Sequence, residues 1–406
     1  MPTDRVLIVG GGLAGPSLAL ALARQNIRSS IFELRPTRTI AEGSISLAPN
    51  ALRALDHVIG VYDRLKAAAF SYRRLAMHAD DGYLFGHLVQ HDDEYDALRI
   101  LRSTLHNIML DACEEQPELV QVRYGVRITS IEDRDDGVTL HFEDGTTARG
   151  DILIGADGIH SKVREHILGA SAPTPTFLGS CMLTGTLPLA SLNAPPDWTF
   201  PAVLFTHVGL VSVWPHNPSG TEAAWCVAED LPPKDRAAWR EYAASGAAAR
   251  AAKRNYAGVQ TPVIRALMDN LWTPHCIPEL PRWHRARVCL IGDAAHALPP
   301  NGQGSAMAFE DAAYLARLLG AHPLGAPRDV ARVFAQFERN RRPRIERVRA
   351  LAHGTGGAKG GTAAGWKYTL KKWGMAAYFA WNGYELRDER ISGYDVTKQD
   401  VGVGVE

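Results

Sequence analysis

Residues 291–312, IGDAAHALPPNGQGSAMAFEDA, gather side chains that often do chemistry in proteins. Around two prolines and a Gly-Gln-Gly run stand three acids, a histidine and a serine: Asp293, Glu310, Asp311, His296 and Ser305. These residue types are compatible with a hydrolytic centre, a metal site or the wall of a cofactor pocket. The rest of the sequence is needed to choose among the three.

Neither a hydrolytic centre nor a metal site fits the pattern. Ser305 does not stand in the G-x-S-x-G turn that exposes a nucleophile, and no separate Asp/His pair is marked out. One histidine among carboxylates at irregular spacing is not a ligand set, so no metal is predicted. We expect His296 to be packed or hydrogen-bonded. A cofactor pocket is the favoured interpretation.

A nucleotide-binding turn is indicated near the start of the chain by Gly10-x-Gly12-x-x-Gly15. It lies between the apolar run RVLIVG (5–10) and an Ala- and Leu-rich helix pattern. Glycines at this spacing let the backbone approach a pyrophosphate at a helix N-terminus. Glu33 ends a second predicted strand, SSIFELR (29–35), where an acid can accept hydrogen bonds from a ribose diol. The pattern predicts the adenosine of FAD or NAD.

Two further predicted strands end in polar residues. Asp157 and Gly158 follow the strand DILIG (151–155), and Ser161 is placed to cap the next helix. The strand in RVCLIGD (287–293) leads to Asp293, and a helix follows the PPNGQG turn. Parallel sheets bind ligands at such strand ends, and a helix N-terminus stabilises an anion. This arrangement suits a polyol chain and a reduced isoalloxazine ring.

Composition excludes several other classes of protein. Lys plus Arg and Asp plus Glu both number 44, so no net charge favours nucleic acid or an anionic membrane surface. No apolar run approaches the roughly 20 residues of an integral membrane segment. An apolar strand begins within the first few residues, so no signal peptide is expected. The five cysteines are scattered and form no C-x-x-C pair, which favours a reducing, cytoplasmic location.

Two segments towards the C-terminus are predicted to have structural roles. The basic run from Arg339 to Arg349 is expected to be a solvated helix face, with phosphate or partner binding as the alternative. The aromatic-rich segment 365–385 is expected to be a helix that packs its Trp and Tyr side chains onto the body. Membrane anchoring is the alternative for this second segment.

The three motifs, in this order, resemble the single-component FAD monooxygenases of the flavoprotein aromatic hydroxylase family, which includes salicylate and para-hydroxybenzoate hydroxylases. The matching segments are VLIVGGGLAGPSLALALA, GDILIGADGIHSKVRE and VCLIGDAAHALPPNGQGSAMAFEDA. Residues 45–65 and 100–110 also resemble family segments, and the likeness covers roughly residues 5 to 350.

The resemblance implies an α/β fold: a Rossmann-like FAD-binding domain with an inserted mixed β-sheet substrate domain and C-terminal helices. We expect residues 1–75, 100–171 and 282–345 to form the FAD-binding domain. Residues 76–99 and 172–281, where composition changes, are expected to form the substrate domain. Residues 346–406 would form a C-terminal helical segment.

The resemblance also implies which residues bind FAD. The first turn would contact the pyrophosphate, and Glu33 with its neighbours would contact the adenine ribose. Arg102 would lie near the phosphates, and Asp293 would contact the ribityl chain. The full set of expected cofactor-binding residues is Gly10, Gly12, Leu13, Ala14, Gly15, Glu33, Leu34, Arg35, Arg102, Asp157, Gly158, Asp293, Gly302, Gly304 and Ser305. Asp157 and Gly158 match a motif implicated in both FAD and nicotinamide binding.

By resemblance, NAD(P)H reduces FAD, O2 gives a flavin C4a-hydroperoxide, and one oxygen passes to an aromatic or polyketide-like small molecule, as in secondary metabolism. The protein supplies electrostatics and water exclusion, which explains the absence of a catalytic dyad. No catalytic residue is assigned. Alternatives are an epoxidase or another oxygen-inserting flavoenzyme on an alkene, indole or antibiotic scaffold, and, from another class, a non-catalytic nucleotide-binding protein.

The sequence departs from the family pattern at two places. The segment from Asp293 to Gly304 is one residue shorter than the commonest family form, which shifts the amides that would face the flavin. Many members have Arg-Gly in the first strand of the middle domain, where this chain has Thr184-Gly185. If that arginine binds a substrate carboxylate or phenolate, this chain is expected to take a less acidic substrate. Phe205, His207, Trp214 and His216, on one β-run, are candidates to line the substrate site.

Overall fold

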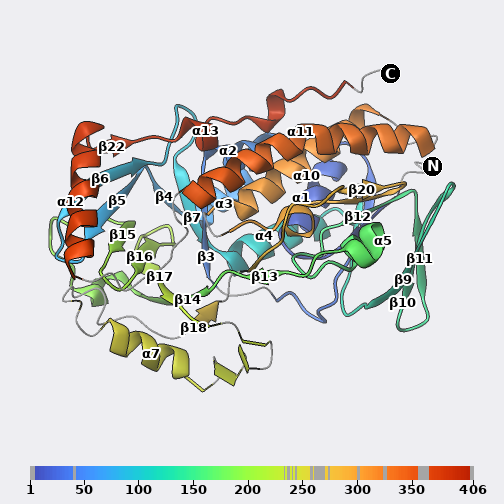
Figure 1. Cartoon of the computed structure of the whole chain (residues 1–406). Helices are drawn as coiled ribbons and strands as arrows, with labels where there is room; N and C mark the ends of the chain where they lie inside the picture. The colour runs from blue at the N-terminus through green and yellow to red at the C-terminus, as the bar shows by residue number, and fades with distance from the viewer. Residues whose placement is uncertain are drawn as a thin grey trace.

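Two large sheets, with helices packed against them, make up most of the molecule (Figure 1). The computed structural model describes residues 5–39, 43–232, 234–235, 238–239, 241–242, 245–256, 259, 270–272, 275–299, 302–322, 327–354 and 365–402. The predicted helix over 236–253 therefore lies partly outside the described residues, which hold α7 (Ala247–Asn255).

The first sheet has six strands and carries the predicted nucleotide-binding turn. Their spatial order is β20 (His284–Arg285), β21 (Val288–Leu290), β12 (Ile152–Gly155), β1 (Arg5–Val9), β2 (Arg28–Phe32) and β8 (Val120–Arg123). All neighbours are parallel except β20 and β21. After β1 the chain forms β2 on one side of β1, while β12 pairs with β1 on the other side. The ends of β1 and β12 therefore form a topological switch point, where such sheets bind ligands.

Helices cover this sheet. They are α1 (Ala14–Ala23), α4 (Arg102–Glu114), α5 (Lys162–Leu168), α9 (Asp293–His296), α10 (Gly304–Ala321) and α11 (Pro327–Gly354). Helix α1 packs against both α4 and α10. Its residues Gly15–Ala23 are all buried, as expected for a helix that is apolar on every side. The predicted β1–α1–β2 unit and the helix after the PPNGQG turn are confirmed, while Pro300 and Asn301 lie outside the described residues.

A small antiparallel sheet projects at one end of the molecule, far from α12 (Gly365–Trp381) in Figure 1. It consists of β9 (Ile128–Arg134), β10 (Gly137–Phe142) and β11 (Thr147–Gly150). Its two reversals lie at Asp136-Gly137 and Asp144-Gly145, where both glycines have positive φ. The hairpins predicted between residues 119 and 155 are thus confirmed.

The second large sheet has eight strands and is mixed, as predicted. In spatial order they are β18 (Asn270–Trp272), β14 (Ser180–Pro188), β17 (Glu222–Asp230), β16 (Leu210–Pro215), β15 (Ala202–Phe205), β5 (Arg74–Ala79), β6 (Leu84–Val89) and β22 (Glu385–Leu386). Two pairs, β15·β5 and β6·β22, are parallel and the others antiparallel.

The expectation that residues 202–215 form one β-run is wrong, because the segment is a hairpin of β15 and β16. The Thr206 hydroxyl accepts hydrogen bonds from the amides of Val208 and Gly209 and closes the turn. In the resulting register Phe205 lies opposite Leu210, so Phe205 shares a sheet face with Trp214.

A three-stranded sheet, β3 (Ser44–Leu47), β7 (Ala97–Leu101) and β4 (Phe70–Tyr72), connects the two parts. The chain passes from β3 through α2 (Pro49–Arg53), a π-helical turn (Ala54–Ile59) and α3 (Tyr62–Ala68) to β4. Strand β7 leads directly into α4, so Arg99 of β7 and Arg102 of α4 are three residues apart. This junction places the phosphate-binding candidate Arg102 beside the sheet formed by β3, β7 and β4.

Helix α12 forms as predicted, but most of its large side chains do not pack onto the body. Its packed face presents Ala376 and Phe379 to β5 and β6, and the Tyr368 hydroxyl bonds Asp80. The opposite face leaves exposed the side chains of Trp366, Leu370, Trp373, Tyr378 and Trp381. The expectation fails because helical spacing sends residues 366, 370, 373 and 381 to the side away from the sheet. None of the described helices is long and apolar enough to cross a membrane.

Candidate cofactor site

In the glycine turn after β1 the fold requires Gly10 and Gly15, whereas Gly12 faces open space. A Cβ on Gly15 would lie 2.0 Å from the carbonyl oxygen of Gly10, so the turn tolerates no side chain there. A Cβ on Gly12 would meet nothing within 4 Å. The protein itself thus does not explain Gly12, whereas a pyrophosphate at the N-terminus of α1 would.

Glu33 follows β2 and holds this turn through its carboxylate. One oxygen accepts the amide of Gly11 at 2.7 Å and the other the amide of Arg35 at 2.8 Å. The side chain is buried, yet a carboxylate can accept about four hydrogen bonds, so two positions are left for a ribose diol. Leu34, by contrast, is exposed beside it, and Leu13 is buried at the start of α1.

His106 of α4 is a part of this site that the sequence analysis missed. Its Nε2 lies 2.6 Å from the carbonyl oxygen of Gly11, and its Nδ1 is buried with no hydrogen-bond partner from the residues that the structure describes. Burial lowers the pKa of His106, so the neutral imidazole that donates to Gly11 is favoured at neutral pH. Only its position four residues after Arg102 on one helix could have suggested it.

Arg102 and Asp293 reach the same edge from different parts of the chain. Burial lowers the pKa of Arg102, and the nearby charge of Asp293 opposes that shift. The Nε of Arg102 is buried and has no hydrogen-bond partner among the described residues. Asp293 is the exposed first residue of α9, just past β21. The Arg102 guanidinium is thus suited to bind a phosphate, and the exposed Asp293 carboxylate is suited to bind the hydroxyls of a polyol next to it.

Asp157 lies at the end of β12, beside the glycine turn, but its carboxylate serves the fold. It accepts hydrogen bonds from the Ser161 hydroxyl at 2.5 Å and from the amides of Lys162 and Val163. Ser161 in turn accepts the amide of Arg164, so its predicted capping role is confirmed. Gly158, with φ of 74°, leaves the space beside it open. Backbone at Gly158, more than the Asp157 side chain, is therefore free to meet a ligand.

The turn before α10 is fixed by a buried polar cluster. Gly302, Gly304 and Ser305 stand at the N-terminus of this 18-residue helix. The Asn50 amide donates to Gln303 at 3.2 Å and to Glu310 at 2.8 Å, which ties α2 to the turn. The amides at such a helix start carry partial positive charge. The described part of the turn can thus face an anionic ring.

Behind this turn, Glu310 and Asp311 form ion pairs with two arginines of α11. Arg341 contacts both acids, at 2.8 and 2.7 Å, and Arg344 contacts Glu310 at 3.0 Å. His296 lies 2.6 Å from Asp311 and is packed, as expected. The expectation of a solvated basic face is wrong for these two arginines, because each has a buried carboxylate partner.

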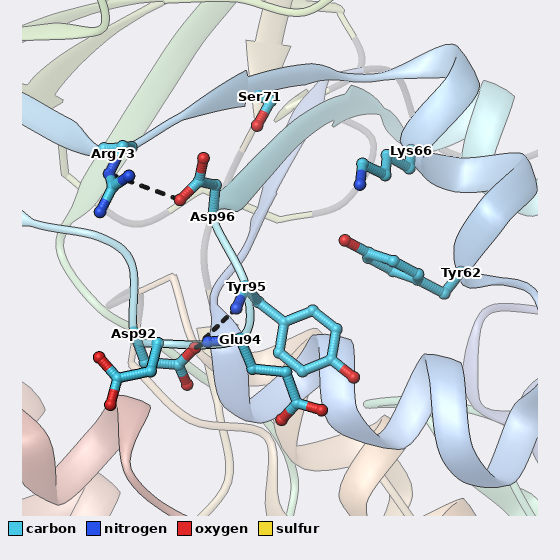
Figure 2. A pocket seen from close by; sticks show the side chains of 9 residues that line it. Tyr62, Lys66, Ser71, Arg73, Asp92, Glu94, Tyr95 and Asp96 are labelled. Carbon is cyan, nitrogen blue, oxygen red and sulfur yellow. Dashed lines mark hydrogen bonds and ion pairs between the residues drawn. The ribbon is translucent and has the colours of Figure 1, made fainter.

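A cavity of about 370 Å³ in the described part of the chain does not belong to this site. It lies at the start of β7, away from Arg102, and is lined by α3, β4 and the loop before β7 (Figure 2). Figure 2 shows Asp96 paired with Arg73, while Tyr62 and Lys66 of α3 face the loop. Four acids, Asp92, Asp93, Glu94 and Asp96, are among its lining residues, which does not suit an anionic cofactor.

Fold and site together define a nucleotide-binding flavoprotein with a second sheet. A family model described as "FAD binding domain" matches residues 3–352. Salicylate hydroxylase of Pseudomonas putida is 32% identical over 395 residues, covering 87% of this chain and 85% of the relative. The 6-hydroxynicotinate 3-monooxygenase of Bordetella bronchiseptica is 29% identical, covering 86% and 90%. The structure of Klebsiella pneumoniae HpxO complexed with FAD and uric acid has a TM-score of 0.75, with 26% identity over 94% and 95% of the two chains.

The chain belongs to the FAD-dependent aromatic monooxygenase family. It is an oxidoreductase that uses FAD, with NAD(P)H as the usual reductant of the family. The resemblance inferred from the three motifs is confirmed. Neither the epoxidase alternative nor the non-catalytic alternative is favoured by relatives that are monooxygenases and hydroxylases.

Proposed function

We propose that FAD binds along the edge where β1, β2, β12 and β21 end, in contact with the residues predicted from the sequence. The glycine turn and α1 would hold the pyrophosphate, Glu33 the ribose, Arg102 the phosphates and Asp293 the ribityl hydroxyls. Gly302, Gly304 and Ser305 would stand against the ring system. The open space at Gly12 is the single observation that best supports this placement, because the protein itself leaves it unfilled.

The domain limits follow the sheets in this proposal. Residues of the six-stranded sheet and its helices form the FAD-binding domain, and the eight-stranded sheet forms the substrate domain. The three-stranded sheet connects them, so its face and the facing side of the large sheet would enclose the substrate. We also propose a cytoplasmic location, since all five cysteines are described and none forms a disulfide.

The reaction would be the NAD(P)H- and O2-dependent hydroxylation of a small aromatic or polyketide-like molecule. Bound FAD supplies the redox chemistry, including transfer of one oxygen atom. The residues of this chain would orient the ring, exclude water and stabilise negative charge at the N-terminus of α10. Because bound FAD would supply the redox chemistry, the residues of this chain would need no conventional catalytic dyad.

Oxygen labelling tests the proposal. The FAD-loaded protein is mixed with NADH or NADPH and a panel of phenols, indoles and polyketides under ¹⁸O2. Substrate-stimulated oxidation of the reductant, with a product heavier by one labelled oxygen, is the expected result. Label arriving only from water, or oxidation that no aromatic compound stimulates, would contradict it.

A further inference from the structure

Arg99 of β7 is a cation that faces the eight-stranded sheet without an acidic partner. Its Nε donates to the Ser44 hydroxyl at 2.9 Å, and its guanidinium carbon lies 4.3 Å from the centre of the Trp214 ring. Within the described ranges no carboxylate forms an ion pair with it, and Ser44 is the one hydrogen-bond acceptor that it meets. Most other arginines of the interior, such as Arg341, have a carboxylate or carbonyl partner.

The surroundings of Arg99 make an unpaired charge costly. Tyr72 and Trp214 pack edge to face beside it, with ring centres 6.1 Å apart. Burial lowers the pKa of Arg99 to about 10, although Tyr72 and Cys226 oppose the shift. At neutral pH the side chain stays charged and keeps some exposed surface. A charge held in a poorly solvated place without a partner is stabilised when an anion binds.

His216 is a second unsatisfied group at this place. Its side chain is only 9% exposed, and its Nε2 is buried without a hydrogen-bond partner in the described part of the chain. Burial lowers the pKa of His216, and the nearby charge of Arg99 lowers it further, so the imidazole is neutral. Because residues 214 and 216 alternate to the same side, His216 lies on the face that carries Trp214. A neutral imidazole nitrogen suits a hydroxyl or ring nitrogen of a ligand.

We propose that Arg99 binds a carboxylate of the aromatic substrate, while Trp214 lies under that ion pair and His216 hydrogen-bonds a neighbouring polar atom. The inference rests on the proposed function and names its substrate class. It reverses the expectation of a less acidic substrate drawn from Thr184. Thr184 of β14 pairs with Cys226 of β17, whose thiol interacts with Arg99. Arg99 of β7 therefore places a cation in the region where many family members have an arginine on β14.

Matched acid and amide ligands test this assignment. The FAD-bound protein is titrated with salicylate against salicylamide, and with 4-hydroxybenzoate against 4-hydroxybenzamide. Binding is followed by the perturbation of the flavin spectrum, without NAD(P)H. For at least one pair the wild type is expected to bind the acid about 10- to 100-fold more tightly than the amide. Arg99→Gln should abolish this preference by weakening the acid alone, and Arg99→Lys should keep part of it.

Arg74→Gln is the matched control, since Arg74 is an exposed arginine of β5 paired with Glu385. It should leave the acid-to-amide ratio unchanged. The proposal is overturned if the wild type binds acid and amide equally in both pairs, or if Arg99→Gln retains FAD and the wild-type ratio. The wild-type comparison decides even if the variant fails to fold. A wild type that prefers the acid but shows no substrate-stimulated NAD(P)H oxidation would refute the proposed function and leave this inference standing.

Discussion

The Nε of Arg341 donates to the Asp311 carboxylate at 2.7 Å, and neither side chain has any exposed surface. The same guanidinium reaches Glu310 on the other side at 2.8 Å. Asp311 also accepts the amide of Gly292, the residue before Asp293, at 2.9 Å. Helix α11 thus holds, through Asp311 of α10, the end of the strand that presents the proposed ribityl ligand.

Replacing Arg341 by Met should destabilise the protein by about 3–5 kcal/mol, because two buried carboxylates each lose the arginine that they share. Urea unfolding of the apoprotein measures this loss. Arg339→Met is the control, since Arg339 is exposed on the same helix, and its effect should stay within about 0.5 kcal/mol. Equal stabilities of the two variants would show that the buried ion pairs contribute little.

Glu338 should make stability depend on pH in the acid range. Burial alone would raise the pKa of Glu338, but hydrogen bonds from His284 and Arg342 outweigh it and lower that pKa to about 2. Its contribution is therefore complete above the ordinary value of 4.5 and is lost as the pH falls from there towards 2.

Glu338→Gln should accordingly cost on the order of 2 kcal/mol at pH 7, with a gap to wild type that narrows between pH 4.5 and 3. Unfolding free energies across this range are the measurement. Glu346→Gln, at an exposed position of α11, should follow the wild-type curve. A gap that is constant with pH would argue against this source of acid sensitivity.

Two glycines of the first turn should separate folding from cofactor binding. Gly15→Ala places a Cβ 2.0 Å from the Gly10 carbonyl and should cost about 1–3 kcal/mol of apoprotein stability. Gly12→Val meets no protein atom with its Cβ and should leave that stability within about 0.5 kcal/mol of wild type. It should nevertheless weaken FAD binding about 100-fold, as titration of the apoprotein with FAD would measure. Unchanged FAD affinity in Gly12→Val would move the pyrophosphate elsewhere.

Arg102→Met should act on affinity and stability in different ways. Removal of a buried guanidinium with an unpaired Nε should not destabilise the apoprotein, while the loss of a phosphate contact should weaken FAD binding about 10- to 100-fold. Thermal unfolding with and without FAD gives both numbers. Arg64→Met, which breaks an exposed pair with Glu115, should change neither by much. A less stable Arg102→Met apoprotein would mean that the arginine is structural.

The sequence predicted the parts whose signals are local. Continuous apolar runs identified the central strands, and the glycine spacing, with Glu33 at the end of the next strand, identified the first turn. Strand ends then predicted that Asp157 and Asp293 would reach one edge, since parallel strands end together. The side-chain task of Asp157 was not predictable, because Ser161 and the amides of α5 compete for its oxygens.

The parts that escaped prediction depend on distant partners. In the sequence Arg341 is one of a run of charged residues typical of a solvated helix face. Its two carboxylate partners, Glu310 and Asp311, lie about thirty residues earlier on another helix. The turn at Thr206 carries no proline or Asn-Gly signal, and a hydroxyl closes it instead. The position of Arg99 was not predictable from the sequence, because its strand is short and its contacts come from β3 and the eight-stranded sheet.

The late position of Arg341 also bears on biosynthesis. Synthesis runs from the N-terminus, so the glycine turn leaves the ribosome first, β21 only at residues 288–290, and α11 last among these elements. Until α11 has been made, Glu310 and Asp311 have no arginine partners, and the strand end at Gly292 lacks its support. The cofactor edge is therefore completed only once α11 has been made, and FAD should join the chain after that point.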